Sequence, residues 1–188
     1  MSARTFTRKA FSTTSHRSLL LSARTQTKAM APLRFYIDEI RFFERDVALR
    51  LPFRFGVATL TSCPQVHVQV RIRFTDGRTM LGCAAERLVP KWFDKNIALS
   101  NEDNFEQLRA ALKLARSAYT AEPAARTAWS HFAVHYDSVL QAGAQAGLNP
   151  LVASYGPALI DRAVLDALCL HLQCSFAQAM ATNAPGVA

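Results

Sequence analysis

Apolar and polar residues alternate over residues 65–74, which is the repeat of a β-strand with one buried side and one solvent-facing side. A segment rich in aromatic and β-branched residues, 35–47, precedes it and also reads as a strand. The Asp76-Gly77 pair that follows is a strong turn signal, so the chain should fold back over residues 78–86. The pattern predicts a three-stranded antiparallel meander.

Two long loops are predicted between and after these strands. Residues 48–64 interrupt the alternation with Pro52, Gly56 and Pro64, and residues 87–99 separate the last strand from the helical part. In an up-down-up meander both loops leave the same end of the sheet. We therefore expect them to cover one site.

After residue 99 the repeat of apolar residues changes from 2 to 3.6. Ser100, with Asp103 three residues later, has the pattern of a capping box that begins a helix. The expected buried stripe of this helix contains Phe105, Leu108, Leu112, Ala115 and Tyr119. A second helix is expected from Pro123 to Gly147. Its expected stripe contains Trp129, Phe132, Tyr136, Val139 and Leu140.

Asn149-Pro150 begins a third helical segment, which we expect to be interrupted at Gly156-Pro157 and buried on most sides beyond that point. Ser175 is expected to begin a last short helix. Strands followed by helices, without β-α-β alternation, define the α+β class. The fold class predicted is α+β, with the meander followed by a bundle of three to four helices.

The sequence predicts three parts: a leader over residues 1–32, one compact domain over 33–183 and a linker stub over 184–188. The leader is rich in Ser, Thr and Arg, which is the composition of a mitochondrial transit peptide. Two interpretations stay open. A real transit peptide directs the protein to the mitochondrial matrix, whereas a disordered leader, with translation starting at Met30, leaves it cytoplasmic.

The net charge of +8 resides mainly in the leader region. Residues 1–37 hold seven of the 22 basic groups and no acidic group, so the remaining residues are nearly neutral. A nucleic-acid-binding surface needs a basic patch on the fold itself, so we expect no nucleic-acid partner. No apolar run approaches the roughly 20 residues that span a bilayer, so no membrane association is expected either.

Two pairs of ionisable residues lie on predicted helices and could form a metal or charge site. His131 and His135 have the four-residue spacing of a helical metal site, but no third ligand is near in sequence. We expect both on a solvated flank of their helix, and no metal site. Asp161 and Asp166 are five residues apart and do not share a helix face. Asp161 is expected to be a local helix charge or the ion-pair partner of Arg162.

The four cysteines show no CxxC spacing and are expected to be small buried residues rather than a disulfide scaffold or a zinc site: Cys63, Cys83, Cys169 and Cys174. Ser62-Cys63 could hold a nucleophile, but no strand-turn-helix context surrounds it. No catalytic residue is therefore predicted. Trp92 and Phe93 lie between two lysines, where packing under a loop and a ligand-facing lid are equally good interpretations.

Three stretches of the chain carry a family pattern: IRFFERDVALRLPFRFGVATLTSCPQVHVQVRI (40–72), DGRTMLGCAAE (76–86) and LIDRAVLDALCLHLQCSFAQAM (159–180). Together they resemble the N-terminal capping domain of the enolase superfamily, in its mandelate racemase and muconate lactonizing enzyme branch. The resemblance covers about residues 33–187. It implies an enolase N-terminal domain-like fold.

In that family a barrel of roughly 200–250 residues follows the cap and supplies the acid–base residue and the carboxylates that hold Mg²⁺. The resemblance therefore implies a cap without its C-terminal barrel, with no cofactor in this chain and no catalysis by this chain alone. The parent would be a Mg²⁺-dependent racemase, cycloisomerase or sugar-acid dehydratase. The implied partners are a C-terminal barrel domain or a second barrel-bearing chain, a small carboxylate molecule, and further copies of the chain in a homo-oligomer.

By the same resemblance, the predicted loops 48–64 and 87–99 match the two cap loops that close over the barrel mouth and select the substrate. This implies four substrate-lid candidates: Phe53, Phe55, Thr59 and Trp92. The alternative is a stand-alone α+β binding or interaction module descended from such a cap.

Overall fold

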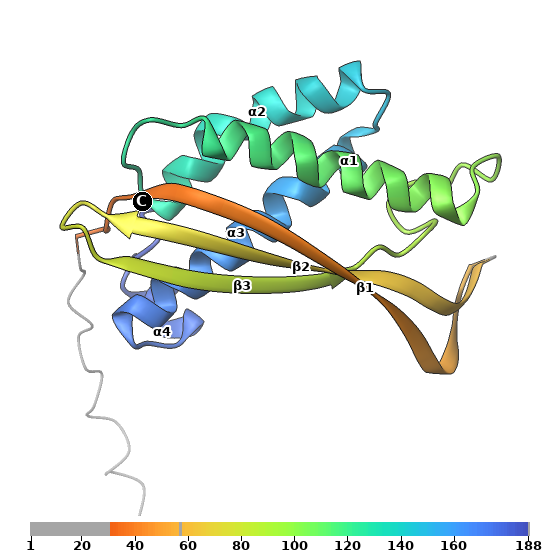
Figure 1. The fold of residues 1–188 in the computed structure, drawn as a ribbon, viewed down its shortest axis with the longest axis horizontal. Helices are drawn as coiled ribbons and strands as arrows, with labels where there is room; N and C mark the ends of the chain where they lie inside the picture. Colours follow the sequence, from red (N-terminus) through yellow and green to blue (C-terminus); the bar gives the residue numbers. More distant parts are fainter. Residues whose placement is uncertain (1–30, 57, 188) are drawn as a thin grey trace, which may run out of the picture.

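The computed structural model describes residues 31–56 and 58–187, so the predictions made for the leader lie outside the described residues. Strands β1 (Phe35–Phe55), β2 (Ala58–Phe74) and β3 (Thr79–Arg87) form an antiparallel sheet in the order β1-β2-β3. Helices α1 (Asn101–Thr120), α2 (Ala128–Gln145), α3 (Pro150–Leu172) and α4 (Phe176–Ala181) follow (Figure 1). The predicted α+β class, a meander followed by helices, is confirmed.

The core lies between one face of the sheet and α3. The alternating residues of β2 that were expected inside are all buried, namely Val66, Val68, Val70, Ile72 and Phe74. α3 packs against β2 and β3, and α1 and α2 pack against α3. α3 is therefore covered on most sides, as its apolar sequence predicts. Within the described residues, no helix is long and apolar enough to cross a bilayer.

The prediction of a loop over residues 48–64 was wrong, because this segment is the far end of a β-hairpin. β1 and β2 continue to pair down to Phe55 opposite Ala58. Gly56, with φ of 51°, supplies the left-handed backbone of the turn. The hairpin extends beyond the end of β3 at Arg87 and projects away from the helices (Figure 1).

The two prolines that suggested a loop are both accommodated by the sheet. Pro52 lies on the edge strand, inside the register shift between Ala48 and Phe53, where the ladder is already interrupted. Pro64 accepts a 2.9 Å hydrogen bond from the backbone N–H of Leu88, just past the end of β3. Because Pro64 has no N–H to return the second bond of this pair, the β2–β3 ladder ends here, at the end of β3.

α1 begins where the capping box predicts. Ser100 accepts from the backbone N–H of Asp103, and the Asp103 carboxylate accepts from the N–H of Ser100. All five residues of the predicted stripe are buried. The expected break of α3 at Gly156-Pro157 was wrong, because the helix runs through it. Gly156 lets α1 cross so closely that a Cβ there would lie 2.3 Å from the carbonyl oxygen of Ala111.

The expected solvent exposure of His131 and His135 was also wrong. His131 is fully buried, donates from Nε2 to the carbonyl of Phe35 at 2.9 Å and stacks on that ring. His135 is half-buried, with its ring 5.0 Å from the ring of Tyr119 and its Nε2 3.7 Å from the carboxylate of Glu122. Burial lowers the pKa of both imidazoles.

The buried face of α2 differs from the predicted one, because backbone hydrogen bonds fix the position of its first turn. It begins at Ala128, not at Pro123, with Thr127 as its cap. Just before it, Phe35 and Arg126 exchange two backbone hydrogen bonds of 3.0 Å. This pairing places the histidines over the start of β1 and leaves Trp129, predicted as buried, 43% exposed.

Asp161 does not pair with Arg162, so the ion-pair interpretation was wrong. The hydroxyl of Tyr119 donates to the Asp161 carboxylate at 2.9 Å, and Arg162 instead forms a 2.9 Å ion pair with Glu86. Burial raises the pKa of Asp161 to about 7, although the Tyr119 hydrogen bond opposes this. The Asp166 carboxylate contacts β3 instead of Asp161, so the two do not share a helix face, as their five-residue spacing predicts.

α3 also completes the outer edge of β3. The carboxylate of Asp166 accepts a 2.8 Å hydrogen bond from the backbone N–H of Cys83. The guanidinium of Arg162 donates to the backbone carbonyl of Ala85 at 3.1 Å. Side chains of one helix thus satisfy two successive outward-facing residues of this edge strand.

The buried carboxyl of Asp161 predicts a pH-dependent stability. Its pKa is raised in the fold from about 3.9 in an unfolded chain. Stability from this group is therefore full below pH 4 and falls as the pH rises through 7, by about 2–4 kcal/mol. Asp161→Asn should remove this loss. Urea unfolding of both proteins between pH 4 and 8 measures it, and parallel curves would contradict the assignment. His131 and His135 make stability rise with pH instead, and because both proteins contain them, their effect cancels when the two curves are subtracted.

Residues 184–187, predicted to belong to a linker, lie against α2. Ala184 is fully buried, and the carbonyl of Pro185 accepts a 3.0 Å hydrogen bond from the N–H of Trp129. The C-terminal segment thereby reaches the start of β1, where the C mark lies in Figure 1. The boundaries of the predicted parts of the chain stay predictions.

Candidate functional site

The tip of the β1–β2 hairpin meets the segment that follows β3 at one end of the sheet. The rings of Phe55 and Trp92 make an edge-on contact with centroids 5.4 Å apart, and Phe53 lies 5.5 Å from Phe55. We call Phe53, Phe55 and Trp92 the aromatic cluster. The structure thus joins the two segments that were expected to cover one site, although one of them is a hairpin and not a loop.

A cavity of about 820 Å³ opens beside this cluster. Phe55, Trp92, Leu60 and Ile97 give it apolar walls, and Thr59 lines it from β2. Phe53 instead faces a smaller hollow of about 350 Å³, which Trp92 also lines. All four lid candidates therefore gather at this end of the sheet, three of them around the larger cavity.

Two lysines line the larger cavity, and they differ in what holds them. The ammonium of Lys91 donates to the backbone carbonyls of Asn96 and Leu99, so it closes its own loop. Lys95 is exposed, and its ammonium has no partner among the described residues. Lys95 is therefore the cation that remains available to a ligand in the cavity.

The segment 88–99 is held in place by α1. The backbone N–H of Lys91, at a left-handed φ of 62°, donates to the buried side chain of Asn104 at 3.0 Å. The carboxylate of Asp94 accepts from the N–H of Asn96 and from the side chain of Gln107. These two hydrogen bonds lower the pKa of Asp94, that from Asn96 most.

Trp92 and Phe93 differ in how far they are buried. Phe93 is half-buried and contacts the ring of Tyr155 at 5.1 Å, so it packs under the loop. Trp92 is 52% exposed and extends over the hairpin. Packing under the loop therefore describes Phe93, and the ligand-facing lid stays a prediction for Trp92.

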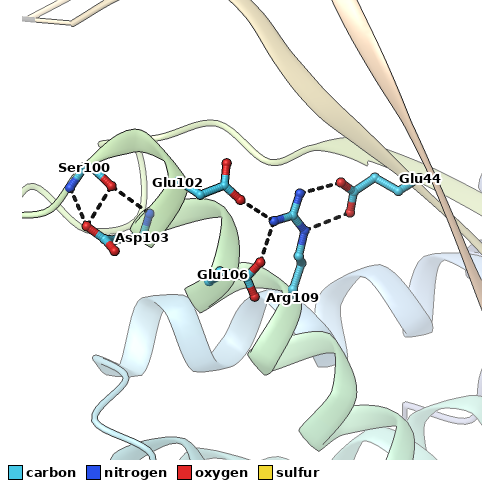
Figure 2. A network of polar contacts seen from close by, with 6 residues as sticks. All are labelled: Glu44, Ser100, Glu102, Asp103, Glu106 and Arg109. Atoms are coloured by element: carbon cyan, nitrogen blue, oxygen red, sulfur yellow. Dashed lines mark hydrogen bonds and ion pairs between the residues drawn. The ribbon is translucent and has the colours of Figure 1, made fainter.

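Charged groups fix the base of the hairpin to α1 (Figure 2). The guanidinium of Arg109 binds the carboxylate of Glu44 on β1, at 3.0 Å from Nε, and also contacts Glu102 and Glu106 on its own helix. The Glu44 hydrogen bonds contribute most to raising the pKa of Arg109. The network anchors β1 at the point where it leaves the helices, while the tip stays free of them.

The cavity is lined by apolar side chains, by hydroxyl and amide groups and by the two lysines. Its described lining includes no carboxyl, imidazole or thiol group. Within residues 31–56 and 58–187, no three His, Cys, Asp or Glu side chains gather closely enough to hold a metal ion. Apolar walls, the Thr59 hydroxyl and the Lys95 ammonium suit a small anionic molecule with an apolar part.

Sequence analysis missed Leu60 and Ile97 as cavity residues. Ile97 is 85% exposed, and a large apolar residue in a loop of Asp, Lys and Asn is a signal that could have identified it. Leu60 is buried and lies on the same face of β2 as Val66. It could be placed at the cavity only once residues 48–64 were known to form a hairpin and not a loop. The contact between Glu44 and Arg109 has no local signal in the sequence.

No protein-family model matches this chain, and no curated protein matches it. Solved structures similar to it include the following two. One is a mandelate racemase/muconate lactonizing protein from Herpetosiphon aurantiacus, at 18% identity and a TM-score of 0.40. The other is a putative mandelate racemase/muconate lactonizing enzyme from Sorangium cellulosum, at 22% identity and a TM-score of 0.33. Each match covers 73% of this chain, which spans 32% of the solved chain.

Both structures carry the name of the branch that the three sequence stretches resemble. The chain corresponds to about a third of their length. The α+β class itself rests on the meander and the helices described above, and the site rests on the contacts of this chain's own residues.

Proposed function

We propose that this chain is a capping module that closes over a substrate held by an enolase-superfamily barrel. The observation that carries the proposal is the contact between Phe55 and Trp92, which joins the hairpin tip to the segment after β3 over one cavity. A projecting tip on an anchored base is the arrangement expected of a lid. The barrel would belong to a longer polypeptide or to a second chain.

The ligand that suits this lid is a small carboxylate with an apolar part. Lys95 offers a positive charge that no described acceptor uses, and Trp92 and Ile97 offer exposed apolar surface beside it. An ammonium at the mouth of an apolar cavity attracts an anion and orients its charged end. The lid residues would select the substrate by shape, without reacting with it.

The chemistry of the parent enzyme would depend on the barrel. The described residues do not fit a Mg²⁺ ion, because no three His, Cys, Asp or Glu side chains gather among them. We derive no step through that ion in this chain. Racemisation, cycloisomerisation and dehydration are therefore proposals for the parent protein alone.

The isolated chain should not exchange the α-proton of hydroxy acids. Such exchange needs a positioned base and, in the resembling family, carboxylates that hold Mg²⁺; the described residues bring together no such metal-binding cluster. The purified chain would be incubated with Mg²⁺ and a panel of small hydroxy acids in D₂O, and deuterium at the α-carbon measured by NMR. A metal-free sample is the control. Metal-dependent uptake above that control would contradict the capping proposal.

A stand-alone binding module is the second candidate, and the self-contained core favours it. β2, α1 and α3 bury their apolar faces within the described residues, without a further domain. A stand-alone module has no large apolar surface left to cover, whereas a cap separated from its barrel exposes one.

The state of the purified chain in solution discriminates the two candidates. A separated cap should self-associate at micromolar concentration, or bind a hydrophobic dye, through exposed residues such as Phe53, Trp92 and Ile97. Analytical ultracentrifugation with and without the first 30 residues measures this. A monodisperse monomer that binds no dye would favour the stand-alone module.

A further inference from the structure

Three of the four cysteines surround a second cavity, of about 850 Å³, between β3 and the end of α3. Cys83, Cys169 and Cys174 line it together with Asp166 and Arg162. Of the four cysteines that were expected to be buried, only Cys63 is. Cys83 is exposed and the other two are half-buried, so their thiols can be reached from solvent.

Cys169 and Cys174 are held together by the way α3 ends. The N–H of Cys174 donates to the carbonyl of Cys169 at 3.1 Å, and the N–H of Gln173 donates to the carbonyl of Leu170 at 3.2 Å. Gln173 has a left-handed backbone, with φ of 51°. This pair of bonds is the Schellman motif, which brings the side chains of its first and last residues into contact.

In most helices these two positions hold apolar side chains, and here they hold two cysteines. Both side chains line the same cavity and are half-buried. A backbone hydrogen bond between the two residues also keeps their Cα atoms close, as a disulfide requires. The fold thus holds a dithiol in one place without any CxxC spacing in the sequence.

We propose that Cys169 and Cys174 form a reversible disulfide by exchange with a small-molecule disulfide such as oxidised glutathione. Cys174 attacks as thiolate, its sulfur bonds to one glutathione sulfur, and the other glutathione leaves as a thiol after taking up a proton. The Cys169 thiolate then attacks the Cys174 sulfur and releases the second glutathione. Two protein thiols are oxidised, and one glutathione disulfide is reduced to two glutathione thiols.

The order of attack follows from the surroundings of the two sulfurs. Burial raises the pKa of Cys169 most, and the charges of Cys174 and Asp166 raise it further. Cys169 is therefore mainly protonated at neutral pH and suits the second, intramolecular step. Cys83 and Arg162 face the same cavity from β3 and α3, so Cys83 is the thiol that could compete. This inference does not depend on the capping proposal.

The test uses the full native chain, reduced and then exposed to oxidised glutathione at about pH 8.5, where thiolates form. Free thiols are blocked with an alkylating reagent, and mass spectrometry with peptide mapping follows. The expected product is about 2 Da lighter than the reduced chain before alkylation, with a bond between Cys169 and Cys174. Dithiothreitol should reverse it.

Matched variants identify the pair. Cys83→Ser should still close, because Cys83 lines the cavity outside the motif. Cys169→Ser and Cys174→Ser should each stop at a stable glutathione adduct or remain unmodified. A bond that maps to Cys83, or a wild-type chain that stops at the glutathione adduct, would overturn the proposal.

The rate of disulfide closure shows whether the fold holds the two thiols together or whether they react only because they are near in sequence. If the Schellman motif holds the thiols together, the native chain should close at least about tenfold faster than the same chain in urea. Closure in the native chain that is equal to or slower than in urea would show that the fold does not promote this bond, and would overturn the inference.

Discussion

Gly156→Ala should destabilise the protein by about 1–3 kcal/mol, although alanine is the better helix former by about 1 kcal/mol. The new Cβ would lie 2.3 Å from the carbonyl oxygen and 2.8 Å from the carbonyl carbon of Ala111, both backbone atoms of α1. A backbone atom cannot rotate away, so α1 and α3 must separate. The strain therefore outweighs the gain in helix propensity.

Urea unfolding monitored by far-UV circular dichroism measures this loss. Ala158→Gly is the control, because Ala158 is exposed two residues further along the same helix. That control should cost only the propensity difference of about 1 kcal/mol. A Gly156→Ala protein as stable as the wild type would mean that the two helices cross less closely than described.

Leu168→Ala should cost about 2–5 kcal/mol, because Leu168 is fully buried in α3 and its loss leaves a cavity. From the sequence, Leu165 and Leu168 are equally good core positions. The structure separates them, since Leu165 is only half-buried. Leu165→Ala should therefore cost clearly less, because less apolar surface is lost from the core. Equal losses in urea unfolding would contradict the assignment of the core.

The sequence predicts most of this fold because its strongest signals are local. The alternation around Val70 and the capping box at Ser100 each depend on neighbouring residues, and both are found where expected. Pro52 led to the wrong prediction of a loop, and Gly156 to the wrong prediction of a break in α3, for the same reason. Each is a residue that usually interrupts an element, and here a distant partner or a sheet edge accommodates it.

The parts that could not be predicted depend on contacts between distant segments. Phe35 pairs with Arg126 just before α2, and His131 is buried against Phe35, a residue 96 positions away in the sequence. For the candidate site, Trp92 could be named from the sequence, and its contact with Phe55 agrees with the predicted proximity of the two segments. The available charge of Lys95 emerges only once the hydrogen bonds of Lys91 are known.

The hydrogen bonds from α3 to β3 determine how this sheet can extend. An edge strand with free N–H and C=O groups can pair with a strand of another molecule, which is how many aggregates begin. On β3 the outward N–H of Cys83 and the outward carbonyl of Ala85 are already bound by Asp166 and Arg162. Intermolecular strand addition should therefore use the opposite edge, along β1, where Pro52 limits how far a continuous ladder can grow.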